Sequence, residues 1–197
     1  MRRCFLLALC VCLTLCACGR STPTRYYVLE SAAPEVASGD MPATSLRVAA
    51  VSVPQYLDRT SLVQRGAQAG SLNVDDTQQW AEPLAEGVRR VVQEALAAPL
   101  RQKGVHVLAN ADDSDSEYVL FIHVERLEAF SADTARLTAQ WRCEKGRRIV
   151  GQGVFSASEK MAGEGTSALV QAHSALVRQM AAWILERLPV SGAATKR

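Results

Sequence analysis

The stretch TARLTAQWRC, residues 134–143, decides the fold class of this chain, because its apolar and polar side chains alternate one by one. A period of two is typical of a β-strand with one buried face and one face in solvent. The apolar face carries Ala135, Leu137, Ala139, Trp141 and Cys143. The turn sequence EKGR follows at residues 144–147, and residues 149–158 return, so we expect an antiparallel hairpin.

Two segments have the three-four spacing of an amphipathic helix. The first is residues 80–98, with Pro83 in its first turn and Pro99 expected to stop it. The second begins at Thr166, a candidate N-cap, and ends at Pro189. Its apolar face consists of Leu169, Ala172, Leu176, Val177, Met180, Trp183 and Ile184.

The remaining apolar runs are short enough to be strands. They are residues 26–29, 46–53, 105–108 and 118–124, together with 62–64 and 72–74, which flank Gly66 and Gly70 as a second hairpin. The order of strands and helices predicts an α+β fold. We expect a single domain, with a mainly antiparallel sheet and two amphipathic helices packed on one face.

The N-terminus is typical of a secreted lipoprotein precursor. A basic start at Arg2 and Arg3 precedes the apolar residues 5–15, which are too few to span a membrane. The sequence LCAC then places Leu15 and the small residue Ala17 before Cys18, as in a bacterial lipobox. An ordinary signal peptide cut nearby is the alternative. The predicted division is a lipoprotein signal peptide (1–17), a lipidated tether (18–25), a domain (26–189) and a C-terminal tail (190–197).

Composition narrows the function classes. The chain has 22 basic and 20 acidic residues, and Arg2 and Arg3 leave with the signal peptide, so the domain is neutral. It therefore lacks the excess of basic residues that is typical of nucleic-acid-binding domains. Of the six cysteines, only Cys143 lies beyond Cys18, so no internal disulfide is expected. Membrane attachment is expected through the acyl chains on Cys18.

The sequence predicts no catalytic residue, metal site or cofactor. His106, His123 and His173 are far apart, and neither a metal-binding nor a nucleophile motif occurs. Cys143 is either a nucleophile or, as its apolar strand face favours, a buried hydrophobe. The pair Gly151 and Gly153 suggests a bulge or a close backbone approach.

Two charged clusters have ordinary interpretations beside functional ones. The acidic residues 112–115 are better explained as a solvated turn than as a calcium loop, since the required glycine and glutamate are absent. The basic residues Arg142, Lys145, Arg147 and Arg148 form either a solvated hairpin tip or a contact for an acidic partner.

The segment Tyr56, Leu57, Asp58 and Arg59 is the candidate partner-binding site. It follows Pro54 and combines large apolar side chains with a charge pair on a turn, where binding residues gather. The alternative is that Tyr56 and Leu57 pack on the first helix as part of the fold. The sequence WAEPL, residues 80–84, opens that helix, with Trp80 as a packing staple.

At these residues the chain resembles the ABC-type transport auxiliary lipoprotein family, of the paraquat-inducible protein C type. The matching landmarks, in order, are residues 26–29, 51–57, 58–63 and 80–84, while Thr60 departs from a proline common in the family. The resemblance implies a non-enzymatic envelope lipoprotein, with palmitate among its acyl groups. It also implies an MCE-domain periplasmic partner and, indirectly, an ABC permease and ATPase that move lipid between the two membranes.

Gly19 is not the aspartate that favours inner-membrane retention, so the resemblance implies the periplasmic face of the outer membrane. A homo-oligomer is compatible with this role. Two alternatives stay open. One is another outer-membrane assembly or envelope-stabilising lipoprotein, such as a lipopolysaccharide-assembly partner. The other is a lipid-directed hydrolase.

Overall fold

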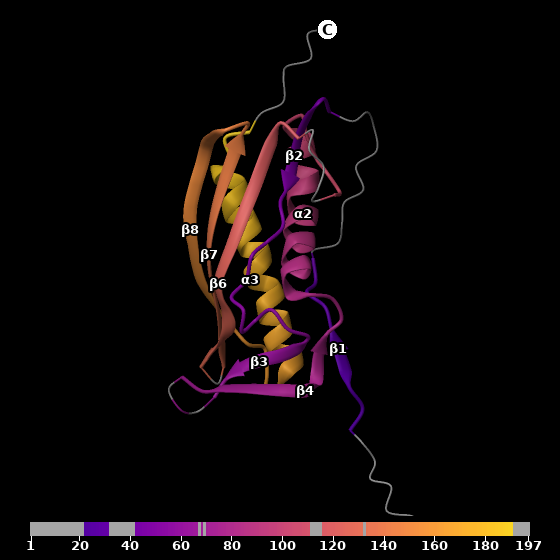
Figure 1. The fold of residues 1–197 in the computed structure, drawn as a ribbon, viewed down its shortest axis with the longest axis vertical. Helices are drawn as coiled ribbons and strands as arrows, with labels where there is room; N and C mark the ends of the chain where they lie inside the picture. Colours follow the sequence, from indigo (N-terminus) through magenta and orange to yellow (C-terminus); the bar gives the residue numbers. More distant parts are fainter. Residues whose placement is uncertain are drawn as a thin grey trace, which may run out of the picture.

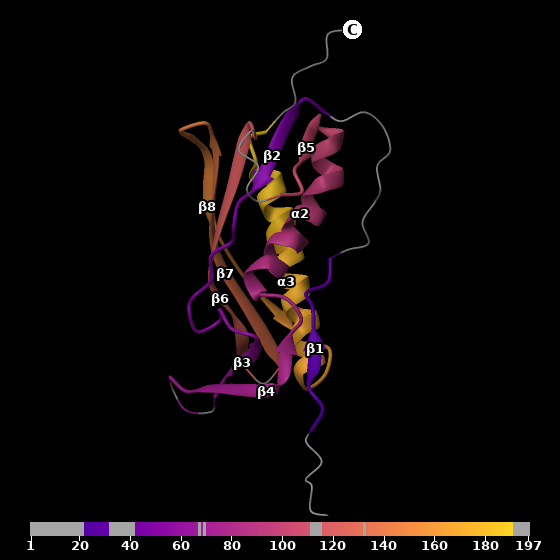
Figure 2. The same ribbon diagram turned by 45° about the vertical axis from the view of Figure 1, so that its right-hand side comes forward.

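A computed structural model describes residues 22–31, 42–66, 68, 70–110, 116–131 and 133–190. It has an α+β fold, as predicted, in which a five-stranded sheet is covered on one face by two helices. Figures 1 and 2 show the sheet and the helix pair as two layers, with the opposite face of the sheet free of helices. A second, three-stranded sheet lies across the lower end of the molecule (Figure 1).

The large sheet is built around three long antiparallel strands. They are β6 (Tyr118–Ser131), β7 (Thr134–Lys145) and β8 (Arg148–Lys160). In β7 the alternating apolar face is buried and the polar face is more exposed, so the predicted hairpin is confirmed. Its buried side packs on the helices because this is where apolar side chains leave water.

The other two strands of the large sheet differ from a purely antiparallel arrangement. β2 (Thr44–Val48) lies between β6 and β5 (Val105–Val107), and it is parallel to both neighbours. The chain leaves β2, passes through the small sheet and a helix, and only then enters β5. Parallel neighbours need such a long connection, which a local pattern does not reveal.

The small sheet has the order β1-β4-β3. The hairpin of β3 (Ser61–Arg65) and β4 (Leu72–Trp80) is antiparallel, as predicted. β1 (Arg25–Tyr27) adds to the other edge of β4 in parallel, an arrangement that the sequence analysis did not predict. This sheet closes the lower end of the helix layer (Figure 2).

Both predicted helices are present, with different ends. α2 runs over Leu84–Gln102, so it begins four residues later than expected, and Pro99 lies inside it. Pro99 removes one backbone donor, but the fully buried Leu100 holds the last turn on the core, and Gly104 ends it at a φ of 72°. α3 runs over Thr166–Arg187, and its N-cap is Gly165 rather than Thr166, without a side-chain capping bond.

The core lies between the large sheet and the helices. Leu46, Leu120 and Leu137 from the sheet, and Leu176 and Ile184 from α3, have no exposed surface. Cys143 is also fully buried, which confirms its placement as a core residue. Burial, with a smaller contribution from Glu144, raises the pKa of its thiol to about 11.

Candidate docking surface

The segment that follows β2 runs along β6 and then turns away. Ala49 and Ser52 donate their backbone N–H groups to Leu120 and Ile122 at 2.9 and 3.1 Å, which extends the parallel pairing. Pro54 begins a tight turn, since its carbonyl accepts the N–H of Leu57 at 2.8 Å. Residues 54–59 therefore form a turn whose base is fixed to the sheet.

The four predicted partner-binding residues divide into two pairs. Leu57 is buried in the core and Tyr56 is half-buried. Asp58 and Arg59 are exposed. Within the described part of the chain, neither of these two charged side chains has a hydrogen bond or an ion pair. The apolar pair is thus a fold element, and the charge pair is the part of the turn that a partner can reach.

Glu128 on β6 holds the turn to the small sheet. It is only 5% exposed, and its Oε1 accepts two hydrogen bonds from Nε and Nη2 of Arg65, each 2.9 Å long. Its Oε2 accepts the Tyr56 hydroxyl at 3.3 Å. Burial and the neighbouring carboxylate raise the pKa of Tyr56. The sequence analysis missed Glu128, because it lies 63 and 72 positions from its two partners.

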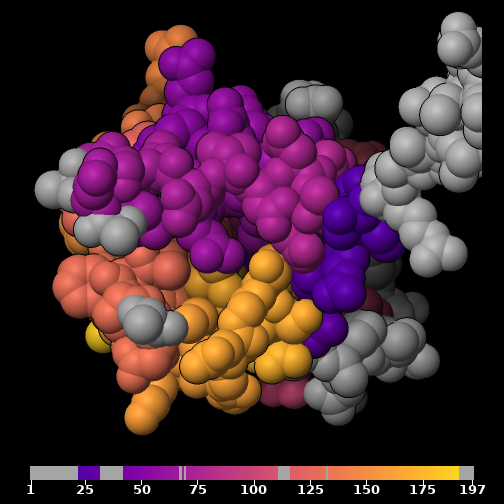
Figure 3. Space-filling model, turned by 90° about the horizontal axis from the view of Figure 1, so that it is seen from below, coloured from indigo at the N-terminus to yellow at the C-terminus, as the bar shows by residue number. Residues whose placement is uncertain are grey.

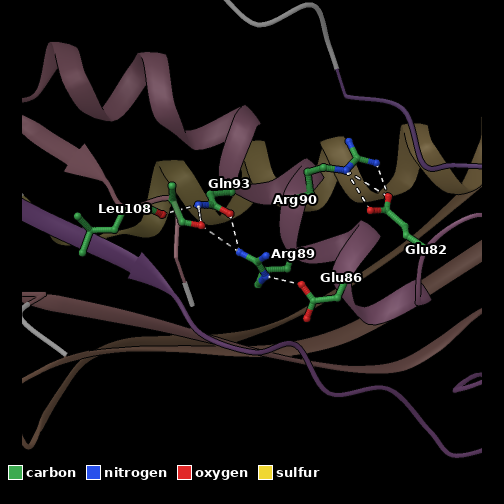
Figure 4. Close-up of polar contacts among 7 residues, drawn as sticks. Glu82, Glu86, Arg89, Arg90, Gln93 and Leu108 are labelled. Atoms are coloured by element: carbon green, nitrogen blue, oxygen red, sulfur yellow. Dashed lines mark hydrogen bonds and ion pairs between the residues drawn. The ribbon is translucent and has the colours of Figure 1, made fainter. Parts of the chain in front are cut away.

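The WAEPL motif is also a fold element. Trp80 is buried and its ring stacks on His173 of α3, with centroids 6.4 Å apart. Figure 4 shows Glu82 paired with Arg90, at 2.6 Å between Oε1 and Nη2. Arg90 also donates to the backbone carbonyl of Leu29 at 2.8 Å. The motif therefore ties the segment after β1 to α2.

The same segment is fastened to α3. The Glu30 N–H donates to the Ser174 hydroxyl at 3.0 Å, and Arg178 donates to the Glu30 carbonyl at 2.7 Å. The residues that follow the proposed tether are thus fixed to both helices.

A second set of contacts lies along α2. Figure 4 shows Arg89 between Glu86 and Gln93, and Gln93 donating to the Leu108 carbonyl.

A groove of about 680 Å³ lies on the helix-free face of the large sheet. Its lining includes Ser52, Phe121, His123, Arg142, Ile149 and Val154. Ser52 Oγ and His123 Nδ1 are 2.7 Å apart although 71 positions separate the two residues in sequence. The tertiary structure therefore brings together a hydroxyl–imidazole pair that no sequence motif predicts. Within the described residues, no carboxylate orients this imidazole as a catalytic triad requires.

The sequence also raises the questions of a metal site and of a basic hairpin. The described residues contain no group of three or more His, Cys, Asp or Glu side chains able to hold a metal ion. In the basic hairpin, Arg142 pairs with Glu144 at 2.8 Å and Lys145 pairs with Glu117 at 2.7 Å. Cys18, Gly19 and the acidic residues 112–115 lie outside the described residues.

Comparison with known proteins assigns the family. The pattern of the ABC-type transport auxiliary lipoprotein component family matches residues 27–184. The chain belongs to this family. The resemblance seen in the sequence is confirmed, and this auxiliary lipoprotein is associated with ABC-type transport. Among curated proteins, none matches.

Two solved structures share the fold of this auxiliary lipoprotein. A Xanthomonas campestris protein of the DUF330 family is 21% identical, with a TM-score of 0.63 over 82% of this chain and 92% of that one. An uncharacterized protein is 19% identical, with a TM-score of 0.69 over 84% of this chain and 98% of that one. Among the helices of the described residues, none has the length and apolarity needed to cross a bilayer.

Proposed function

We propose that this lipoprotein is a non-enzymatic auxiliary component of an MCE/ABC-type system that moves lipid between the inner and outer membranes. Family membership is the observation that carries the proposal. Acylation at Cys18 would place the domain on the periplasmic face of the outer membrane. There it would meet an MCE-domain protein, and through it an ABC permease and ATPase.

The turn 54–59 supports a docking role for Asp58 and Arg59. Both side chains are exposed, and the turn behind them is held by the buried Glu128. A rigid turn loses little conformational entropy when a partner binds its charges. Tyr56 and Leu57 would act by positioning the pair rather than by touching the partner.

Copurification tests this proposal. The full lipoprotein is extracted in detergent and captured, and the retained MCE-domain protein is quantified. We expect Asp58→Ala and Arg59→Ala to reduce retention without changing the melting temperature. Lys103→Ala, an exposed charge just after α2, is the matched control and should retain the partner. Unchanged retention in both turn variants would show that Asp58 and Arg59 are not the interface.

The same capture separates the alternatives. Retention of an outer-membrane β-barrel protein, and of no MCE-domain protein, would indicate another envelope-assembly role. Light scattering of the captured sample gives the oligomeric state in the same experiment.

The Ser52–His123 contact is the specific observation that favours the second candidate, a lipid-directed hydrolase. A serine nucleophile needs a base at hydrogen-bonding distance, and this pair provides one. Hydrolysis of a phospholipid or a short-chain ester by the wild type, and its loss in Ser52→Ala, would establish this activity. We expect no hydrolysis, because the imidazole is exposed and unsupported by a carboxylate within the described residues.

A further inference from the structure

The lower end of the molecule collects chain segments that are distant in sequence. β4 lies across this end, with β3 on one edge and β1 on the other (Figures 1 and 2). Figure 3 looks directly at this end, where the small sheet, the start of α3 and the tip of the β6–β7 hairpin form one surface. The N-terminal part of the chain enters the fold here, through β1.

Exposed apolar side chains gather at the same end. Among the described residues, seven large hydrophobic side chains are exposed, and five of them come from β1, the residue after it, β4 or the end of β6. They are Tyr26, Val28, Leu72, Val74 and Phe130. Tyr26 is 65% exposed and Phe130 is 55% exposed. Exposed apolar patches mark sites of interaction with proteins or membranes, and these five side chains are the candidates at this end.

A cavity of about 320 Å³ with a mixed polar and apolar lining adjoins Phe130. It lies between β3, the end of β6 and the start of α3, and Phe130, Met161 and Leu169 contribute to its lining. The guanidinium of Arg136 stacks on the Phe130 ring at 3.4 Å from its centroid, and Phe130 is still 55% exposed. The aromatic side chain is therefore held by a neighbouring strand while it remains exposed.

The length of the tether limits how far the lower end of the molecule can lie from the bilayer. The chain from Cys18 to Arg25 is seven peptide steps long, and a fully extended chain of this length spans about 25 Å at most. An acylated Cys18 lies at the bilayer surface. Because β1 is fixed to β4 and the following residues to both helices, the lower end stays within reach of the bilayer.

We propose that this end is a membrane-contact surface, where Tyr26, Leu72, Val74 and Phe130 rest at the headgroup level of the leaflet that holds Cys18. The proposal rests on the lipoprotein assignment made above. Tyrosine and phenylalanine suit this depth, since amphipathic and aromatic side chains favour the membrane interface. The domain would then be held by its acyl chains and oriented by its apolar end.

Two carboxylates limit how deeply the lower end of the molecule can enter the bilayer. Asp75 and Asp76 follow Val74 on β4 and are exposed. Hydrogen bonds from the hydroxyl and the backbone N–H of Thr77 lower the pKa of Asp75, so it stays ionised near neutral pH. An ionised group resists transfer into hydrocarbon, so the surface lies on the bilayer rather than within it.

Site-specific labelling tests the orientation. The lipidated full chain is reconstituted in phosphatidylethanolamine–phosphatidylglycerol vesicles and isolated by flotation. Leu72→Cys and Phe130→Cys each receive an environment-sensitive fluorophore, and Ile149→Cys and Val154→Cys are matched exposed controls on β8. We expect a blue shift and at least twofold quenching by headgroup-labelled spin lipids at positions 72 and 130, with neither at 149 and 154.

Each outcome has a separate meaning. Protein that floats but is unquenched at 72 and 130, or equally quenched at 149, overturns the membrane-contact surface while the lipoprotein assignment stands. Protein that fails to float shows that Cys18 is not an anchor, and the lipoprotein proposal falls with it. A blue shift that rises with protein concentration without vesicles would assign this end to a second copy of the chain and overturn the proposal.

Discussion

The indole of Trp141 lies against the backbone of Gly153 on the neighbouring strand β8. A Cβ atom at Gly153 would lie 3.1 Å from Trp141 Nε1, and at the same distance from Trp183 Cη2 of α3. The two indoles meet edge to face, with centroids 6.2 Å apart. The Gly151–Gly153 pair therefore marks a close backbone approach, as one interpretation of the sequence proposed, where two tryptophans pack between the sheet and α3.

Gly153→Ala should destabilise the domain. The added methyl group would lie 3.1 Å from both indoles, so the rings would have to move by a few tenths of an ångström, and overpacking of this kind costs about 1–3 kcal/mol. Urea unfolding measures the change, and Ser156→Ala on the exposed face of the same strand is the control. Equal stability of the two variants would mean that the indoles move aside freely.

Arg65→Ala should destabilise the domain more than Arg142→Ala. Both arginines pair with a glutamate, but the Glu128 side chain is 6% exposed while that of Glu144 is 23% exposed. Loss of Arg65 leaves a buried carboxylate with only the Tyr56 hydroxyl, at a cost of about 1–3 kcal/mol. The more exposed pair should contribute less than about 1 kcal/mol. Chemical denaturation of both variants decides whether burial sets the difference.

The free energy of unfolding should fall as the pH is lowered from 7.5 to 5.5, because in this range His173 can bind a proton only in the unfolded chain. Its ring is fully buried beside Trp80, and burial lowers its pKa to about 3, so the folded state keeps it neutral. The unfolded chain binds a proton below about pH 6.5, so acid favours unfolding, by about 1.4 kcal/mol at pH 5.5. His173→Leu should remove this part of the pH slope. An unchanged slope in that variant would exclude His173 as the source.

Cys143 should resist thiol reagents in the folded domain. With a pKa of about 11, only about one thiol in a thousand is ionised at pH 8. A chain without the signal peptide and with Cys18→Ser has this single thiol, so labelling followed by mass spectrometry gives a direct answer. Labelling within seconds would contradict the burial, and rapid labelling in urea is the positive control.

Cys18→Ser should leave the chain either uncleaved or soluble, without acyl chains. The acyl chains supply the affinity at about 0.8 kcal/mol per buried CH₂ group, and this variant cannot carry them. Incorporation of radioactive palmitate, together with flotation of the envelope fraction, measures the effect. Label retained by the variant would place the lipid elsewhere on the chain.

The sequence by itself determined the elements whose signals are local. The alternation in residues 134–143 sets strand β7 and its buried face, and the three-four spacing after Thr166 sets α3. The hairpins follow from the turns between their strands. The rule that a proline ends a helix fails at Pro99. The helix α2 continues past it, because Leu100 is buried in the core.

The tertiary structure alone decided which distant residues meet. β2 lies between β5 and β6 and is parallel to both. β1 pairs with β4, although β2 and β3 lie between them in the sequence. Only the folded chain brings Arg65 and Tyr56 to Glu128, and only there is the predicted segment 56–59 divided into a buried half and an exposed half. Local periodicity tells which side of a strand or helix leaves water. Which partner it then meets depends on packing between segments that no short stretch of sequence contains.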